Sequence, residues 1–137
     1  MSLNASEQMR SLVTQYIKYL AGRDIENLMS LFAEQVDWFI PGNQDLAPWL
    51  GRRSSKEEIR MFFKMLWENT EPVSAKVEHI LIEGNFGIIT GEFSTRMLKT
   101  GKIFDSIFSI HLTVESNLIV RYRLQEDSYA VSEALTE

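Results

Sequence analysis

The sequence contains no cysteine among its 137 residues. This absence excludes a disulfide framework, a thiolate nucleophile and a cysteine-ligated metal site. The only two histidines, His79 and His111, do not have the spacing of a metal-binding motif. Glycine-rich phosphate loops, nucleophile elbows and paired-histidine motifs are also missing. The residues therefore predict no metal ion and no cofactor, and they argue against nucleotide binding and triad hydrolysis.

Clustered positive charge is equally scarce. The formal net charge is −5, and no run of lysine or arginine is longer than the pair Arg52-Arg53. Because nucleic-acid binding depends on clustered cations, we expect no nucleic-acid partner. No apolar run approaches the roughly 18 residues of a membrane-spanning helix, and the N-terminus lacks the charged and apolar regions of a signal peptide. These absences favour a cytoplasmic protein without a membrane partner.

What remains is the composition of one globular domain covering residues 1–137. Hydrophobic residues make up 45% of the chain and charged residues 24%, which is typical of soluble proteins. Apolar residues first recur at helical spacing and predict three helices. The first runs from about Ser6 to Ala21, the second begins at Asp24, and the third begins at Ser55. A short strand at residues 36–40 and a long loop separate the second helix from the third.

From Val73 onward the apolar period changes to two. This pattern predicts four strands, at residues 74–83, 86–98, 103–114 and 118–126, joined by short hairpins into an antiparallel meander. Because the helices precede the sheet, we predict an α+β fold. Three N-terminal helices form a cone with a strongly bent, mostly antiparallel sheet.

Alternation within the third long strand predicts which face of the sheet is buried. Phe104, Phe108 and Ile110 share one face, which should cover the helices and form the core. The opposite face is mostly polar but carries Ile107. It is either solvated or the surface of a homodimer, and the small residues around Ile107 favour the homodimer.

Two adjacent carboxylates, Glu126 and Asp127, end the last predicted strand. Glu126 follows Tyr122 and Leu124 on the inner face, whereas Asp127 lies beyond the regular alternation. Burial in an apolar pocket raises the pKa of a carboxylate, which suits a general acid or base near neutral pH. Alternatively, Asp127 caps the turn at residues 128–135 and Glu126 is solvated. Both acids are candidate catalytic residues.

Tyr16, on the apolar stripe of the first helix, is the third candidate catalytic residue. Its buried phenol can donate to a ligand carbonyl, or bond to a backbone oxygen as a core residue. Eight further residues are candidates to line a site for a small apolar molecule: Trp38, Trp49, Phe63, Trp67, His79, Phe93, Phe108 and Tyr122. We expect Trp49 to be exposed in the long loop and to contact a ligand, unless it plugs the core. His79 alternates with Val77 and Leu81 and is expected to point inward.

Six segments, in order, resemble the nuclear-transport-factor-2-like superfamily, and within it the SnoaL-like proteins related to ketosteroid isomerase. The segments are YIKYLAGRD at 16–24, LFAEQVDWFIPG at 31–42, WLG at 49–51, EIRMFF at 58–63, TGKIFD at 100–105 and IVRYRLQEDSYAV at 119–131. The resemblance spans the domain. It implies a cystatin-like α+β barrel with a pocket at its open end. Proteins of this superfamily are commonly dimers, so the resemblance also implies a homodimer.

The resemblance also assigns expected roles. Tyr16 matches the tyrosine that polarises the substrate carbonyl in ketosteroid isomerases. The position of their catalytic base holds Ile40 here, and their second acid maps near Ser109 or Ile110, so both acids of that reaction are missing. Asp127 resembles the acid/base aspartate of SnoaL-like polyketide cyclases.

Relatives that resemble limonene epoxide hydrolase use an Asp-Arg-Asp set. Arg96, Asp105 and Asp127 supply these residue types, but the alternation places Arg96 and Asp105 on the outer face. Two hypotheses of function follow. The first is a cofactor-independent isomerase or cyclase that transfers a proton on an apolar carbonyl compound. The second is a non-catalytic module for ligand binding or dimerisation.

Overall fold

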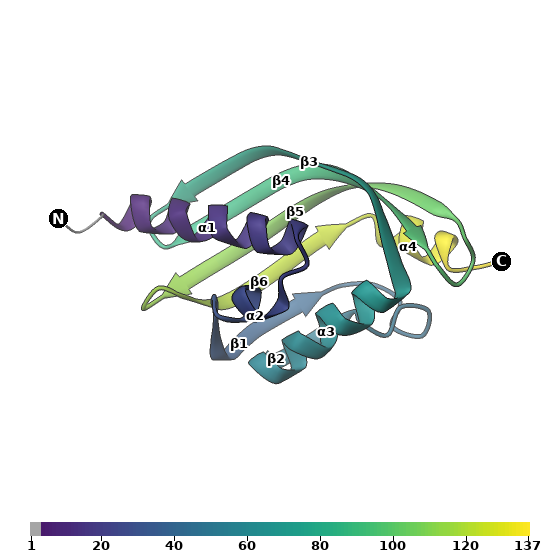
Figure 1. Cartoon of the computed structure of the whole chain (residues 1–137), viewed down its shortest axis with the longest axis horizontal. Coiled ribbons are helices and arrows are strands. Elements are labelled where there is room, and N and C mark those ends of the chain that lie inside the picture. Colours follow the sequence, from purple (N-terminus) through teal and green to yellow (C-terminus); the bar gives the residue numbers. More distant parts are fainter. Residues whose placement is uncertain (1–3) are drawn as a thin grey trace.

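The structure is a computed structural model that describes residues 4–137 (Figure 1). Its helices are α1 (Ala5–Ala21), α2 (Ile25–Met29), α3 (Lys56–Asn69) and α4 (Ser128–Ala134). Its strands are β1 (Phe32–Ile40), β2 (Gly51–Ser55), β3 (Thr70–Glu83), β4 (Phe86–Met97), β5 (Ile103–Glu115) and β6 (Leu118–Glu126). The predicted order of helices and strands is thus confirmed, with β2 and α4 in addition.

Local sequence explains where the two long helices begin. The Asn4 side chain accepts a hydrogen bond from the Glu7 backbone N–H at the start of α1, and the Ser55 hydroxyl accepts one from the Glu58 N–H at the start of α3. Such caps satisfy amide groups that the first helical turn leaves without partners. Each helix then turns an apolar stripe toward the sheet, and Tyr16 is fully buried on the stripe of α1.

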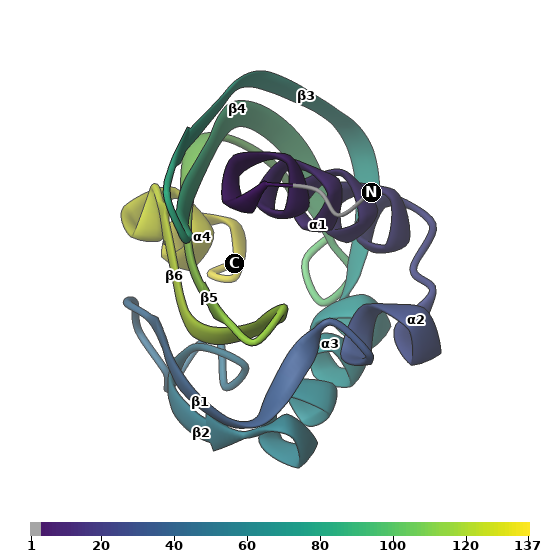
Figure 2. The same ribbon diagram turned by 90° about the vertical axis from the view of Figure 1, so that its left-hand side faces the viewer.

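The strands form one six-stranded sheet in the order β2-β1-β6-β5-β4-β3. Neighbouring strands are antiparallel except β1 and β6, which run parallel. Figure 2 shows the sheet curling around α1 and α3 without closing on itself. The predicted α+β cone is therefore confirmed, as a mixed and unclosed sheet rather than a complete barrel.

β1 and β3 each begin four residues before their predicted starts, and β2 lies in a segment for which the sequence predicts a loop. β1 begins at Phe32, since this residue pairs with Ile119 of β6, four residues before the predicted start. β2 has the sequence GRRSS, which lacks apolar alternation, and it forms by pairing with β1. The turn expected after β6 is the seven-residue helix α4.

The predicted inner face of β5 is confirmed, since Phe104, Ile110 and Leu112 are buried while Ile107 is 72% exposed. The predicted inward direction of His79 is wrong, because this side chain is exposed. On β3 the inner residues are instead Ile80 and Ile82, which pack against the core. Within residues 4–137, no helix is both long and apolar enough to cross a membrane.

Candidate functional site

A pair of tyrosines lies at the centre of the cone. The hydroxyl oxygens of Tyr16 on α1 and Tyr122 on β6 are 2.6 Å apart, and both side chains are almost completely buried. Burial raises the pKa of each phenol well above its ordinary value, so both stay protonated at neutral pH. One hydroxyl must donate to the other, and the second proton is then free for another acceptor.

Aromatic side chains surround this pair. The Trp38 indole stacks on the Tyr122 ring with centroids 4.0 Å apart and planes at 8°. Phe62 and Phe63 on α3 contact Trp38 edge-on, with centroids at 4.9 Å and 6.0 Å. The result is a rigid, water-poor environment that strengthens any hydrogen bond made by the tyrosines.

Glu126 ends the inner face of β6, two alternate positions beyond Tyr122. Burial, together with the charge of the neighbouring Asp127, raises the pKa of the Glu126 carboxyl to about 7. The Glu126 charge in turn contributes to the raised pKa of Tyr122, so the two groups share one electrostatic environment. A carboxyl with this pKa exists in both protonation states near neutral pH, as a general acid or base requires.

The inner face around Glu126 is incompletely covered. Phe108 lies directly across from Glu126 in the β5–β6 pair. Phe93, Phe108, Leu124 and Glu126 are all half-buried, in contrast to the buried residues near Tyr122. The rings of Phe93 and Phe108 have centroids 6.0 Å apart. This end of the sheet therefore presents apolar side chains and one ionisable group to a molecule that reaches it.

Asp127 has a different place from Glu126. Its side chain is exposed and accepts a hydrogen bond from the Ala130 N–H at the start of α4, at 2.9 Å. Its own N–H donates to the Ser106 hydroxyl at 2.9 Å. Asp127 is thus the helix cap that we considered as the alternative, and its charge acts on Glu126 from outside the cone.

A hollow of about 490 Å³ is lined by residues of β3, β4 and β5 together with Asp127, and Asp105 is among them. Asp105 accepts a hydrogen bond from Ser94. Arg96 instead bonds to the Gly101 carbonyl and lies 3.5 Å from a Glu71 carboxylate oxygen. The Asp-Arg-Asp set of the epoxide hydrolases is therefore not assembled.

The remaining predicted lining residues fall into two groups. Trp38, Trp49, Phe63 and Tyr122 are buried, and Trp67, Phe93 and Phe108 are half-buried. The expected exposure of Trp49 is wrong, because its side chain is only 4% exposed and packs into the core. Trp49 therefore closes the open end of the core, which was the alternative to its exposure in the loop. His79 lies outside the site altogether.

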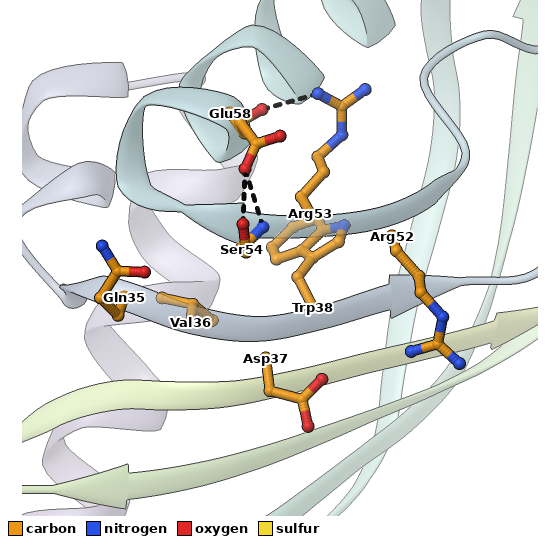
Figure 3. Close-up of a pocket in the computed structure, with 8 residues that line it drawn as sticks. All are labelled: Gln35, Val36, Asp37, Trp38, Arg52, Arg53, Ser54 and Glu58. Atoms are coloured by element: carbon orange, nitrogen blue, oxygen red, sulfur yellow. Dashed lines mark hydrogen bonds between the residues drawn. The ribbon is translucent and has the colours of Figure 1, made fainter.

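A second groove, of about 480 Å³, lies where β1 and β2 approach α3 (Figure 3). Its lining runs from Gln35 to Trp38 on β1 and from Arg52 to Ser54 on β2, with Glu58 of α3. We call it the bulge groove, because the β1–β2 register shifts between Gln35 and Trp38. The sequence pattern does not predict this groove, since β2 gives no strand signal. Among residues 4–137, no group of three or more acidic or histidine side chains is arranged to hold a metal ion.

Solved structures share this fold over nearly the whole chain. An NTF2-like protein from Burkholderia xenovorans LB400 is 18% identical, with a TM-score of 0.86 over 96% of this chain and 98% of that one. An LEH-like epoxide hydrolase from M. tuberculosis is 11% identical, with a TM-score of 0.75 over 96% and 92%. TerC, co-crystallised with polyporic acid, is 16% identical, with a TM-score of 0.79 over 93% and 98%.

These identities establish a shared fold and no more. Among curated protein sequences, none matches the chain. The model of the SnoaL-like domain, however, matches residues 13–122, from the apolar stripe of α1 to Tyr122 on β6. The chain therefore belongs to the SnoaL-like domain family.

Proposed function

We propose that this protein is a cofactor-independent enzyme that transfers a proton on a small, largely apolar carbonyl compound, as an isomerase or a cyclase does. The observation that carries the proposal is Glu126, a half-buried carboxyl with a pKa of about 7 on an apolar inner face. Glu126 would remove a proton next to the carbonyl and return it elsewhere on the molecule. Asp127 supports this role indirectly, because its charge helps to raise the pKa of Glu126.

The tyrosine pair supplies the second part of the chemistry. Tyr16 and Tyr122 are protonated and bonded to each other, so one of their protons is not used within the pair and would be free for a ligand oxygen that reaches these buried hydroxyls. Donation to the oxygen that gains negative charge would stabilise an enolate-like transition state. The Cα atoms of Tyr122 and Glu126, four residues apart on β6, are separated by about 13 Å. A ligand that contacts both groups would therefore be an extended molecule, such as a conjugated ring system.

The test compares the wild-type protein with Glu126→Gln and Glu126→Asp. A β,γ-unsaturated cyclic ketone serves as the isomerisation probe, and polyporic acid, the compound co-crystallised with TerC, serves as an extended probe for binding. We expect isomerisation that follows an apparent pKa near 7, and its loss in Glu126→Gln by roughly a hundredfold or more. Unchanged turnover in Glu126→Gln would reject the role of Glu126.

A non-catalytic binding module is the second candidate. It is favoured by Ile40, which stands where the ketosteroid isomerases hold their base, and by the two tyrosines satisfying each other. In that case polyporic acid would bind with the same affinity to wild type and Glu126→Gln, and no probe would be turned over. Equal binding without turnover therefore distinguishes the module from the enzyme.

We further propose that the outer sheet face forms a homodimer. Ile107 and Leu81 expose apolar side chains there, at 72% and 59% of their surface. Covering them in a second copy would remove this apolar surface from water. Sedimentation of wild type and Ile107→Glu tests the proposal, since a dimer that the variant dissociates supports it and a wild-type monomer rejects it. A cytoplasmic location, like the single domain over residues 1–137, stays a prediction.

A further inference from the structure

The bulge groove lies beside a β-bulge, where β1 and β2 have unequal numbers of residues between two paired positions. Gln35 pairs with Ser55 and Trp38 pairs with Arg53, so β1 has one more residue than β2 between these pairs. Such a bulge leaves backbone groups unpaired and turns neighbouring side chains out of the regular ladder. The resulting groove, about 480 Å³, has the volume of a small-molecule site.

Two buried donors of this groove have no acceptor. Among the residues that the structure describes, the indole Nε1 of Trp38 and the guanidinium Nε of Arg53 are the buried side-chain nitrogens without a hydrogen-bond partner. Trp38 and Arg53 are directly paired across β1 and β2. Figure 3 shows both side chains extending to the α3 side of these strands, with Asp37 on the opposite side. A buried donor without an acceptor costs about 1–3 kcal/mol, so two adjacent ones call for an explanation.

The guanidinium of Arg53 is held in place without being neutralised. Its Nη1 donates to the Glu58 carbonyl at 2.8 Å and its Nη2 to the Trp49 carbonyl at 3.5 Å. Both acceptors are uncharged, and none of the ion pairs within residues 4–137 includes Arg53. Burial lowers the pKa of Arg53, and the charge of the nearby Glu58 carboxylate opposes part of this shift. These bonds use two of the five guanidinium N–H groups, and the Nε–H is the one that is buried without a partner.

The carboxylates nearby are committed elsewhere. One oxygen of Glu58 accepts hydrogen bonds from the Ser54 N–H and hydroxyl, both at 2.9 Å, which Figure 3 marks with dashed lines. Asp37 lies 2.9 Å from Arg123 and 3.5 Å from Arg121, and the Arg123 hydrogen bond is the main reason that the pKa of Asp37 is lowered. The groove is therefore lined by two arginines, Arg52 and Arg53, and by two carboxylates that already accept hydrogen bonds from other groups.

We propose that the bulge groove binds a small carboxylate, which accepts one hydrogen bond from Trp38 Nε1–H and one from Arg53 Nε–H. A carboxylate suits this arrangement because it is planar, carries negative charge and offers two oxygens to two separate donors. It would add negative charge beside Arg53, which forms no ion pair among the described residues and has only the Glu58 carboxylate acting on it as a nearby charge. The site is distinct from Glu126 and the tyrosine pair, and it does not depend on the function proposed for them.

Nuclear magnetic resonance of the full chain tests this directly, because both donors carry an observable N–H. The probes are sodium acetate and sodium benzoate, compared with sodium chloride and sodium phosphate at equal ionic strength. Trp38→Phe identifies the Trp38 indole signal among those of the three tryptophans. We expect acetate or benzoate to shift the Trp38 Nε1–H and Arg53 Nε–H signals together and to saturation, and chloride to leave them unchanged.

Matched variants distinguish specific carboxylate binding in the groove from a general attraction of anions to its positive charge. Arg53→Gln removes the donor and should weaken carboxylate binding roughly tenfold or more. Arg52→Gln removes the same charge from a side chain that lies over the Phe39 ring, 4.6 Å from its centroid, and should weaken binding much less. Glu126→Gln should leave carboxylate binding unchanged, whether or not Glu126 is catalytic.

Three results would overturn the proposal. If no anion shifts the two signals, a trapped water satisfies the donors. If phosphate shifts them as strongly as the carboxylates do, the groove does not select a planar anion. If Arg52→Gln weakens binding as much as Arg53→Gln, the effect is general charge attraction. The first result is read from the wild-type protein, once its indole signals have been assigned, so misfolding of Arg53→Gln or Arg52→Gln cannot hide it.

Discussion

The hydroxyl oxygens of Tyr16 and Tyr122 lie 2.6 Å apart, although 106 positions separate the two residues in sequence. This contact joins the first helix to the last strand inside the cone. It also leaves each phenol dependent on the other, because both side chains are almost completely buried.

Removing one hydroxyl of this pair should lower the free energy of unfolding by more than half of the amount that is lost when both are removed. Tyr16→Phe and Tyr122→Phe each leave a buried hydroxyl with no partner in the pair, which lowers the free energy of unfolding by about 1–3 kcal/mol. The double variant leaves no such orphan, so its loss should fall short of the sum by about 1 kcal/mol. Urea unfolding of the four proteins measures this coupling. Strict additivity would show that the hydroxyls do not stabilise each other.

The stability of the protein should depend on the ionisation of Glu126. Its pKa of about 7 in the folded chain exceeds the ordinary 4.5, so between these values the folded chain holds a proton that the unfolded chain has lost. Stability from this group is therefore full below about pH 4.5 and is lost as the pH rises through 7.

Glu126→Gln removes this dependence. The variant should match wild type at pH 4 and exceed its free energy of unfolding by up to about 3 kcal/mol at pH 8. Urea midpoints measured across this range give the difference at each pH. A difference that is the same at pH 4 and pH 8 would mean that the Glu126 carboxyl is not desolvated.

Asp127→Asn should lower the pKa of Glu126 without unfolding α4. The substitution removes the charge that raises this pKa, while asparagine keeps the cap on Ala130. The pKa should stay above its ordinary value, since burial is the larger cause. Carbon-detected titration of the Glu126 carboxyl measures the shift. Asp105→Asn, on the outer face, is the control and should leave the pKa of Glu126 unchanged.

Gly91 should tolerate no side chain. A β-carbon there would overlap the Lys76 carbonyl oxygen and lie 2.8 Å from the Phe108 ring. Gly91→Ala should therefore destabilise the protein by about 3 kcal/mol and displace the ring that lies opposite Glu126. Gly84→Ala is the control, because its β-carbon meets nothing within 4 Å and only its φ of +59° costs about 1 kcal/mol. Equal losses in thermal unfolding would contradict the crowding at Gly91.

Sequence alternation predicted the inner face of β5 and the last part of β6 because most apolar residues there fall on one side, with Ile107 as the exception on β5. The same alternation placed Glu126 inside the cone beside Leu124. It failed on β3, where His79-Ile80-Leu81-Ile82 offers apolar residues to both faces, so the direction of His79 depends on which set the core accepts. A register shift between Val77 and His79 adds to the ambiguity, because a one-residue shift moves side chains to the other face of the sheet.

Other features depend on contacts that no local pattern encodes. β2 contains no apolar side chain, and its strand exists only through pairing with β1, so the bulge groove was invisible in the sequence. The burial of Trp49 follows from how its loop folds over the core. Asp127 lies one residue past the strand, where alternation ends, and only the structure distinguishes its capping role from an inward one.

The position of β6 between β1 and β5 has a consequence for the order of folding. β1 is made early, yet its parallel neighbour is the last strand of the chain. During synthesis β3, β4 and β5 can pair as a meander, whereas β1 and β2 must wait for β6 to join the two parts of the sheet. Such distant pairing slows folding, and Trp38 would remain without its stacking partner Tyr122 until the final strand arrives.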